Sequence, residues 1–204
     1  MQKKALVVIT ENKWLYLGID NLLPDINCYH HKFNDQNIST ELLNYEHIFI
    51  AVDSLIIIQG LWTALHKIQA LKNNLTVIWL TKQVSGRVFP FDSLDDLIIP
   101  QKINTSRLKE RLREILFTHP LPHSVERVTP LYLTYTERLL LPYFIAGISF
   151  DEISRLTGYA IKSLYTHRQR ITNKAGFKNQ AYLFFVFQSN LGVIGLFSPE
   201  SVGG

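Results

Sequence analysis

Six cations gather in a short stretch of the chain that contains no acidic residue. No Asp or Glu occurs from residue 155 to residue 178, while the same stretch holds Arg155, Lys162, Arg168, Arg170, Lys174 and Lys178. Lys and Arg neutralise phosphates, and this neutralisation supplies most of the non-specific affinity of proteins for nucleic acid. The cations are concentrated well beyond what the overall net charge of +4 suggests. We therefore expect a polyanionic partner for this segment.

Helix start and stop signals surround these cations. Thr134 and Ser149 each stand three positions before a Glu, which is the pattern of a capping box. Gly147 and Gly158 stand where helix ends need a left-handed residue. The signals predict a short helix over 150–157, a turn, and a second helix over about 161–174. The residues expected to face inward are Ile153, Leu156, Leu164 and Ile171.

Two short helices joined by a Gly-containing turn are typical of a helix-turn-helix, whose second helix lies in the major groove. The segment also carries an ordered set of residues: Leu133-Thr134, Glu137, Gly147, Ser149, Glu152-Ile153, Leu156, Gly158, Lys162-Ser163-Leu164, Thr166-His167-Arg168 and Lys174-Ala175-Gly176. In this combination, over about a quarter of the chain, it resembles the DNA-binding domain of LuxR/FixJ (GerE-type) regulators.

The resemblance implies roles for the second helix. Its outer face near Tyr165, Thr166 and Gln169 is expected to approach base edges, because Gln bonds adenine and the Thr methyl contacts thymine. The side chains expected to face phosphates are Lys162, Ser163, His167, Arg168, Arg170 and Lys174. The alternatives are a half-buried aromatic role for Tyr165, a solvated helix end for Lys174 and Lys178, and a structural role for His167.

Two residues depart from the pattern of the family. Ala160 stands where the family usually has a polar N-cap, so the start of the second helix is expected to be weakened. Pro142 falls inside the preceding helix and is expected to kink or split it.

The segment after Gly176 is rich in aromatic residues. Phe177, Tyr182, Phe184, Phe185, Phe187 and Phe197 exceed what one small core requires. An exposed apolar strip is typical of a subunit interface, and in the resembled family the last helix carries dimer contacts. We expect a dimer on an imperfect two-fold site. The alternative is that these aromatics only complete a core or contact the N-terminal domain.

The N-terminal half alternates apolar strands with amphipathic helices. Strand-like runs cover 5–9, 48–52, 75–80 and 97–99, and helical patterns cover 14–23, 61–71 and 106–117. This order predicts an α/β doubly wound sheet, followed by an all-α helix-turn-helix domain. We place the receiver-like domain at 1–117, a linker with two prolines at 118–129, and the DNA-binding domain at 130–204.

The order of strands and helices looks like a response-regulator receiver, whose chemistry holds Mg²⁺ and a phosphoryl group beside an acceptor Asp. In this chain Asp53 ends the third strand, and Thr81 follows the fourth. Thr10-Glu11 stands where two acids belong, and Lys102 is displaced by about two positions from the expected Lys. We expect a degenerate receiver that does not use aspartyl phosphate. The alternative is that Asp53 accepts phosphate with Glu11 assisting through Mg²⁺.

The composition of the chain also indicates its compartment and the kinds of site it contains. Cys28 is the only cysteine, which favours a reducing compartment, and no apolar run approaches the length of a spanning helix. We expect a cytoplasmic protein without a membrane partner. The histidines lack metal-ligand spacing and convergent carboxylates, so we expect no metal, no cofactor and no enzymatic activity. The histidines outside the second helix are His30, His31, His47, His66, His119 and His123.

The sequence therefore predicts a bacterial transcriptional regulator of the response-regulator-like LuxR class. Its expected partners are double-stranded promoter DNA, a second copy or a related regulator, and RNA polymerase. Two alternatives stay open: an auxiliary subunit that works only as a heterodimer with another LuxR-type regulator, and a phosphorylated response regulator that uses Asp53.

Overall fold

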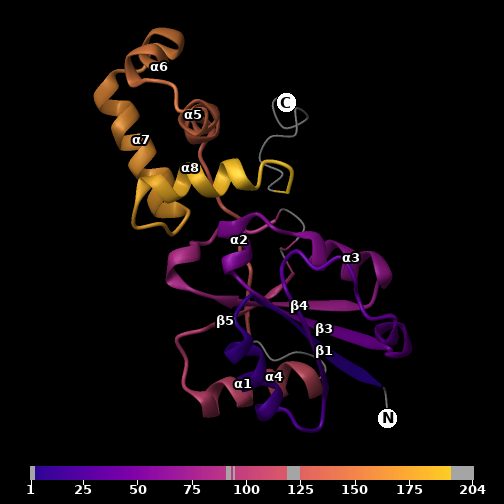
Figure 1. Ribbon diagram of the computed structural model, residues 1–204. Coiled ribbons are helices and arrows are strands. Elements are labelled where there is room, and N and C mark those ends of the chain that lie inside the picture. Colours follow the sequence, from indigo (N-terminus) through magenta and orange to yellow (C-terminus); the bar gives the residue numbers. More distant parts are fainter. Residues whose placement is uncertain (1–2, 91–92, 94, 119–124, 194–204) are drawn as a thin grey trace. The chain divides into compact units, whose positions relative to one another are not determined.

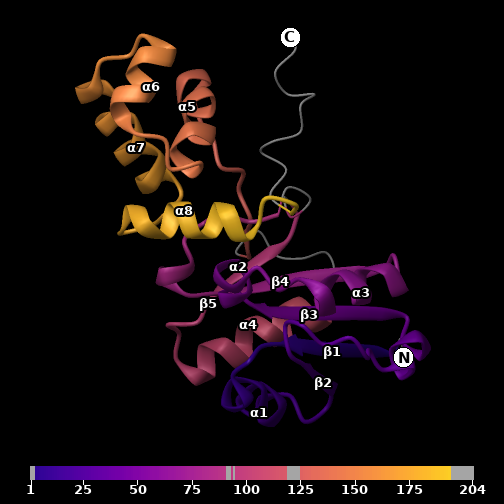
Figure 2. The ribbon, with the colours of Figure 1, turned by 45° about the horizontal axis from the view of Figure 1, so that its top comes forward.

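The computed structural model describes residues 3–90, 93, 95–118 and 125–193. The chain divides into two compact units (Figures 1 and 2). The first unit consists of Met1–Ile56, Leu61–Lys82 and Ser93–Val128, and the second consists of Ile57–Gly60, Gln83–Asp92 and Thr129–Gly204. The expected linker over 118–129 stays a prediction, and its residues 119–124 lie outside the described part of the chain.

The first unit is built on a six-stranded sheet in the order β2-β1-β3-β4-β5-β6. The first five strands are parallel, and β6 pairs antiparallel with β5. The doubly wound α/β class expected from the sequence is confirmed. The strands are β1 (Lys4–Ile9), β2 (Asn27–His31), β3 (His47–Asp53), β4 (Leu75–Thr81), β5 (Leu97–Pro100) and β6 (Glu126–Arg127).

Helices cover both faces of this sheet, with α1 and α4 on one face and α3 on the other (Figure 1). Parallel strands buried on both faces read as continuous apolar runs, and β3 is buried from Ile48 to Asp53. The core on the α1 and α4 side includes Phe49, Ile99 and Leu112. The helices of this part of the chain are α1 (Lys13–Leu22), α2 (Leu55–Gln59), α3 (Thr63–Leu71) and α4 (Thr105–Phe117), with a 3-10 turn at Thr40–Asn44.

The second unit contains four helices along its C-terminal stretch. They are α5 (Tyr135–Ile145), α6 (Phe150–Thr157), α7 (Ile161–Lys174) and α8 (Gln180–Ser189). Leu164 and Ile171 of α7 are fully buried, as the sequence predicts, and α7 packs against α5, α6 and α8. The buried side chains of those three helices include Leu140, Phe144, Ile153, Leu183, Val186 and Phe187.

Three local predictions for this unit need correction. Helix α5 continues through Pro142 instead of splitting, because Pro142 and Arg138 are both exposed and water can solvate the Arg138 carbonyl that loses its partner. Leu156 is 59% exposed instead of buried, so Ile153 alone fills the predicted inward positions of α6. The Ser149 side chain accepts from Glu152 N, but the described contacts place the Glu152 carboxylate near Arg155 instead of completing a capping box.

Candidate nucleic-acid interface and the Asp53 cluster

The exposed face of α7 forms one stripe along the helix. Residues three and four positions apart lie on the same side of a helix, and the exposed residues of α7 follow that spacing. Neither the first turn nor the remainder of α7 contains an acidic residue. We call this stripe the α7 face, and its members are Lys162, Tyr165, Thr166, Gln169, Arg170 and Asn173.

The turn before α7 has the geometry of a tight helix-turn-helix connection. Gly158 ends α6 with φ 74°, a left-handed conformation that favours glycine, and its N–H donates to Ser154 O. Ala160 has the extended conformation of an N-cap but supplies no side-chain acceptor, as expected from the sequence. The N–H groups of the first turn of α7 therefore lack the side-chain partner that Ser149 provides at the start of α6.

Aromatic rings hold Arg168 in place. Its guanidinium carbon lies 4.4 Å from the Phe150 ring centroid and 5.3 Å from that of Tyr165, and these two rings meet edge to face at 4.3 Å. Arg168 Nε is buried and has no hydrogen-bond partner within the described residues. Tyr165 is nevertheless 53% exposed. The cluster thus fixes a cation and an aromatic at the edge of the α7 face.

Polar side chains connect the C-terminal half of the α7 face. Gln169 donates to Asn173 Oδ1 at 2.9 Å and accepts from Gln180 of α8 at the same distance. Asn173 carries an amide that the sequence analysis did not single out, although it follows Thr166 by seven positions and Gln169 by four. This chain of amides presents donors and acceptors of the kind that read base edges.

His167 and Ser163 are half-buried, so the structure does not place them on the exposed face itself. The His167 ring packs edge to face on Tyr159, in the turn, with centroids 5.9 Å apart. The roles of both residues at phosphates stay predictions.

Lys174 joins α7 to α5. Its ammonium lies 2.6 Å from Glu137 Oε2, and the Glu137 side chain is only 2% exposed. Glu137 also completes the capping box of α5 predicted from the sequence, because its carboxylate accepts from Thr134 N and its N–H donates to Thr134 Oγ1. Burial raises the pKa of Glu137, but hydrogen bonds from Lys174 and Thr134 outweigh burial and lower that pKa. The structure therefore gives Lys174 an internal role, and its role at phosphate stays a prediction.

Helix α8 presents two large aromatic side chains to solvent. Tyr182 is 40% and Phe185 is 51% exposed, and they lie three positions apart on one side of the helix. Phe177 and Phe187 are buried and Phe184 is half-buried, so part of the aromatic segment completes the core. Phe197 lies outside the described residues.

In the first unit, Asp53 stands at the carboxyl end of β3, where only 1% of the residue is exposed. Its Oδ2 accepts from Thr10 Oγ1 at 3.0 Å and from Lys82 Nζ at 3.3 Å. Its Oδ1 accepts from Gln101 Nε2 at 2.9 Å and from Leu55 N at 3.1 Å. We call Thr10, Asp53, Lys82 and Gln101 the Asp53 cluster.

The structure corrects the expected contents of this cluster. A lysine does lie beside Asp53, but it is Lys82 after β4. Lys102 is exposed and is not among the residues that bond Asp53. Gln101 occupies the position after β5 and bonds Asp53 itself. The carboxylate of Glu11 accepts a hydrogen bond from Phe33 N at 3.1 Å. It is therefore not among the groups that contact Asp53. Thr81 contributes its carbonyl to Gln101 N.

The described residues contain no group of three or more His, Cys, Asp and Glu side chains that could hold a metal ion. Within the same part of the chain, no helix is long and apolar enough to cross a membrane.

No family model and no curated protein matches this sequence. Solved structures do match its fold. The two-component response regulator RcsB in complex with DNA superposes with a TM-score of 0.60 at 18% identity, covering 93% of this chain and 99% of that one. RcsB from Salmonella enterica serovar Typhimurium, bound to promoter rprA with the phosphomimetic BeF3-, gives a TM-score of 0.59 at 15% identity, covering 91% and 98%.

This chain has the two-domain fold of RcsB-type response regulators. A second structure of the Salmonella protein, bound to promoter P1flhDC, agrees, with a TM-score of 0.57 at 16% identity over 93% of this chain and 99% of that one. The LuxR/FixJ-type architecture expected from the sequence is thereby confirmed at the level of the fold.

Proposed function

We propose that this protein is a transcriptional regulator that binds promoter DNA through the α7 face. The observation that supports this proposal most strongly is the exposed α7 face, which combines cations, amides and hydroxyls with no acidic residue. Polar groups of this kind serve both phosphate and base contacts. Structures of the same fold are complexes with DNA, which supports the proposal.

Within this proposal, Tyr165, Thr166 and Gln169 approach base edges. Lys162 and Arg170 contact phosphates from the same exposed face. The predicted phosphate-facing set also includes Ser163, His167, Arg168 and Lys174. The guanidinium of Arg168 is positioned by the aromatic rings that it contacts. Asn173 joins the base-facing group because it shares a hydrogen bond with Gln169.

Gel shifts with a selected promoter fragment test this assignment. Arg170→Ala should weaken binding to all sequences alike and lower the salt slope by about 1, since one phosphate contact is lost. Gln169→Ala should cost about 1–3 kcal/mol at one base position and relax the preference there. Lys109→Ala is the charge-matched control, because Lys109 is exposed on α4 in the first unit. Equal effects of Lys109→Ala and Arg170→Ala would refute the α7 face as the contact surface.

We further propose that DNA binding does not depend on aspartyl phosphorylation. A phosphoryl donor must reach a carboxylate oxygen, whereas both oxygens of Asp53 accept two hydrogen bonds each and the residue is 1% exposed. After incubation with acetyl phosphate and Mg²⁺, intact mass should be unchanged. A gain of about 80 Da that disappears in Asp53→Asn would contradict this proposal.

The protein is proposed to act as a dimer in the cytoplasm, with α8 at the subunit interface. Support comes from the exposed pair Tyr182 and Phe185. Phe185→Ser should convert the dimer into a monomer. Light scattering on the DNA-free and the DNA-bound protein measures this change. Leu139→Ser, which removes an exposed apolar side chain from α5, is the control.

A second candidate function is an auxiliary subunit that binds DNA only with a related regulator. The uncapped start of α7 at Ala160 favours it, because partner contacts could order that turn. Specific retention of DNA by the purified protein alone would exclude this candidate. Retention only after addition of a LuxR-type partner would support it.

A further inference from the structure

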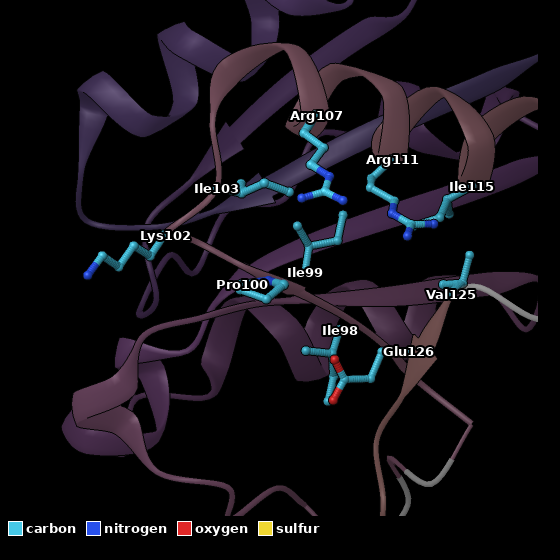
Figure 3. A pocket seen from close by; sticks show the side chains of 10 residues that line it. All are labelled: Ile98, Ile99, Pro100, Lys102, Ile103, Arg107, Arg111, Ile115, Val125 and Glu126. Carbon is cyan, nitrogen blue, oxygen red and sulfur yellow. The ribbon is translucent and has the colours of Figure 1, made fainter.

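A cavity of about 300 Å³ opens beside the β5 edge of the sheet, entirely within the first unit. Its walls come from β5, the segment after it, α4 and the start of β6 (Figure 3). Such a volume lies at the lower end of the range of small-molecule sites, roughly 300–1,000 Å³. Neither the α7 face nor the Asp53 cluster contributes a side chain to it.

Among the described residues, β6 covers only part of the sheet edge beside this cavity. In the described ladder, β6 pairs with Leu97 and Ile98 and does not reach the last two residues of β5. Pro100 has no N–H, so this edge is a poor template for a further strand. This part of the β5 edge is therefore better suited to a compact ligand than to an added strand.

Apolar side chains make the walls of the cavity. Ile99 and Ile115 are 2% and 0% exposed and belong to the core, while Ile103 and Val125 pack against that core as partly buried residues. Desolvation of an alkyl chain against these side chains is favourable in proportion to the area removed from water.

Two guanidinium groups converge on these walls. Figure 3 shows Arg107 and Arg111 extending from α4, one turn apart. The Arg107 guanidinium lies beside Ile99 and Ile103, and the Arg111 guanidinium lies beside Ile115. Arg111 also bonds Glu114 at 2.8 Å. The Arg107 side chain makes no hydrogen bond or ion pair with another described residue. Lys102 adds a third cation to the lining of the cavity. Glu126 is the one anionic residue of the lining, so cations are in excess.

From this arrangement we propose a binding site for a small amphipathic carboxylate, whose alkyl chain lies against the isoleucines and whose head group bonds Arg107. A planar guanidinium binds a carboxylate through two parallel hydrogen bonds, which favours this anion over a neutral or cationic head group. The site is separate from the proposed DNA contacts and does not depend on them.

Octanoate is the probe, titrated into the full-length protein by isothermal calorimetry. Octanol, octylammonium and acetate separate the contributions of charge and chain. We expect octanoate to bind at least tenfold more tightly than each of the other three, since a charge-assisted hydrogen bond and the buried chain each contribute about a factor of ten or more. Equal binding of octanol, or binding of acetate as tight as that of octanoate, would overturn the proposal.

Variants locate the site. Arg107→Ala should weaken octanoate binding roughly tenfold or more. Lys109→Ala removes the same charge from an exposed position of α4 that does not line the cavity, and should change binding less than about twofold. Both replacements are at exposed helix positions, and circular dichroism verifies that the fold is retained. Equal weakening by the two variants, or no octanoate binding to the wild-type protein, would contradict the site.

Discussion

Replacement of Lys174 by Met tests the ion pair that joins α7 to α5. Methionine retains an unbranched side chain near the Lys174 position but removes the ammonium that lies 2.6 Å from Glu137 Oε2. The Glu137 carboxylate then stays buried, at 2% exposed, and keeps the hydrogen bond from Thr134 N at 2.7 Å.

The expected loss of stability follows from this geometry. Removing one partner of a fully buried ion pair costs about 3–5 kcal/mol. The side chain of Lys174 is 39% exposed, and Thr134 N remains a partner of Glu137, so the expected loss is smaller than for a fully buried pair. We expect about 1.5–3 kcal/mol, the value of a hydrogen bond to a charged group. For a unit of this size, that corresponds to a fall in Tm of roughly 6–24 °C.

The pH dependence of the stability of Lys174→Met should be weaker than that of the wild type. In the wild type the pKa of Glu137 is lowered, so its contribution to stability is present above the ordinary value of 4.5 and is lost as the pH falls through the folded-state pKa. Lys174→Met loses the hydrogen bond and the charge of Lys174, which lower this pKa, so the pKa of Glu137 should be higher in the variant than in the wild type. The carboxylate then contributes less stability at neutral pH, and the gap in stability between the two proteins should narrow as the pH falls through 4.5 and Glu137 becomes protonated.

Thermal unfolding by two probes separates the units. All three tryptophans, Trp14, Trp62 and Trp79, belong to the first unit, whereas far-UV circular dichroism reports helices of both. Lys174→Met should lower the dichroism transition of the second unit and leave the tryptophan transition unchanged. Lys178→Met, at an exposed position, is the control. An unchanged dichroism transition, or the same loss in Lys178→Met, would refute the role assigned to the pair.

Further predictions concern the helix cap, a buried carboxyl and the Asp53 cluster. Ala160→Ser should stabilise the second unit by about 0.5–2 kcal/mol in chemical denaturation, because the backbone already has N-cap geometry; a destabilised variant would contradict this. Burial raises the pKa of Asp96 to about 6, so its contribution to the stability of the first unit is lost as the pH rises through about 6. Asp96→Asn should abolish that dependence in tryptophan-detected unfolding, and a persistent step near pH 6 would refute it. Asp53→Ala should destabilise the first unit by about 1–3 kcal/mol, since Thr10 Oγ1 and Leu55 N lose their hydrogen bonds to the Asp53 carboxylate. Chemical denaturation followed by tryptophan fluorescence measures this loss of stability, and an unchanged free energy of unfolding would contradict the prediction.

The sequence allowed prediction of those elements whose signal is local. The helix predicted over 161–174 has the same bounds as α7, because the spacing of its apolar residues and the glycines on either side of it are local features of the sequence. Strand β2 was missed because NCYHH lies at the sheet edge, with four of its five residues only half-buried or exposed, and has no apolar run. Helix α2 was missed because Leu55–Ile58 is an apolar run that cannot be distinguished from a strand by periodicity.

Prediction failed where tertiary contacts decide the outcome. Lys82 and Gln101 meet Asp53 from loops after different strands, and nothing in their spacing indicates that contact. Arg168 stacks on Phe150, eighteen positions earlier, and Lys174 pairs with Glu137, thirty-seven positions earlier. Periodicity places a side chain on a face of its helix, but it does not identify the residue that another helix brings to that face.

Selection of bound duplexes from a randomised DNA pool tests whether the α7 face reads DNA sequence. We predict that the wild-type protein enriches one imperfect two-fold sequence, that Gln169→Ala relaxes one position in each half, and that Arg170→Ala lowers recovery without changing the sequence. A pool that shows no enrichment with the wild-type protein, or an identical selected sequence and recovery for both variants, would contradict DNA reading by the α7 face.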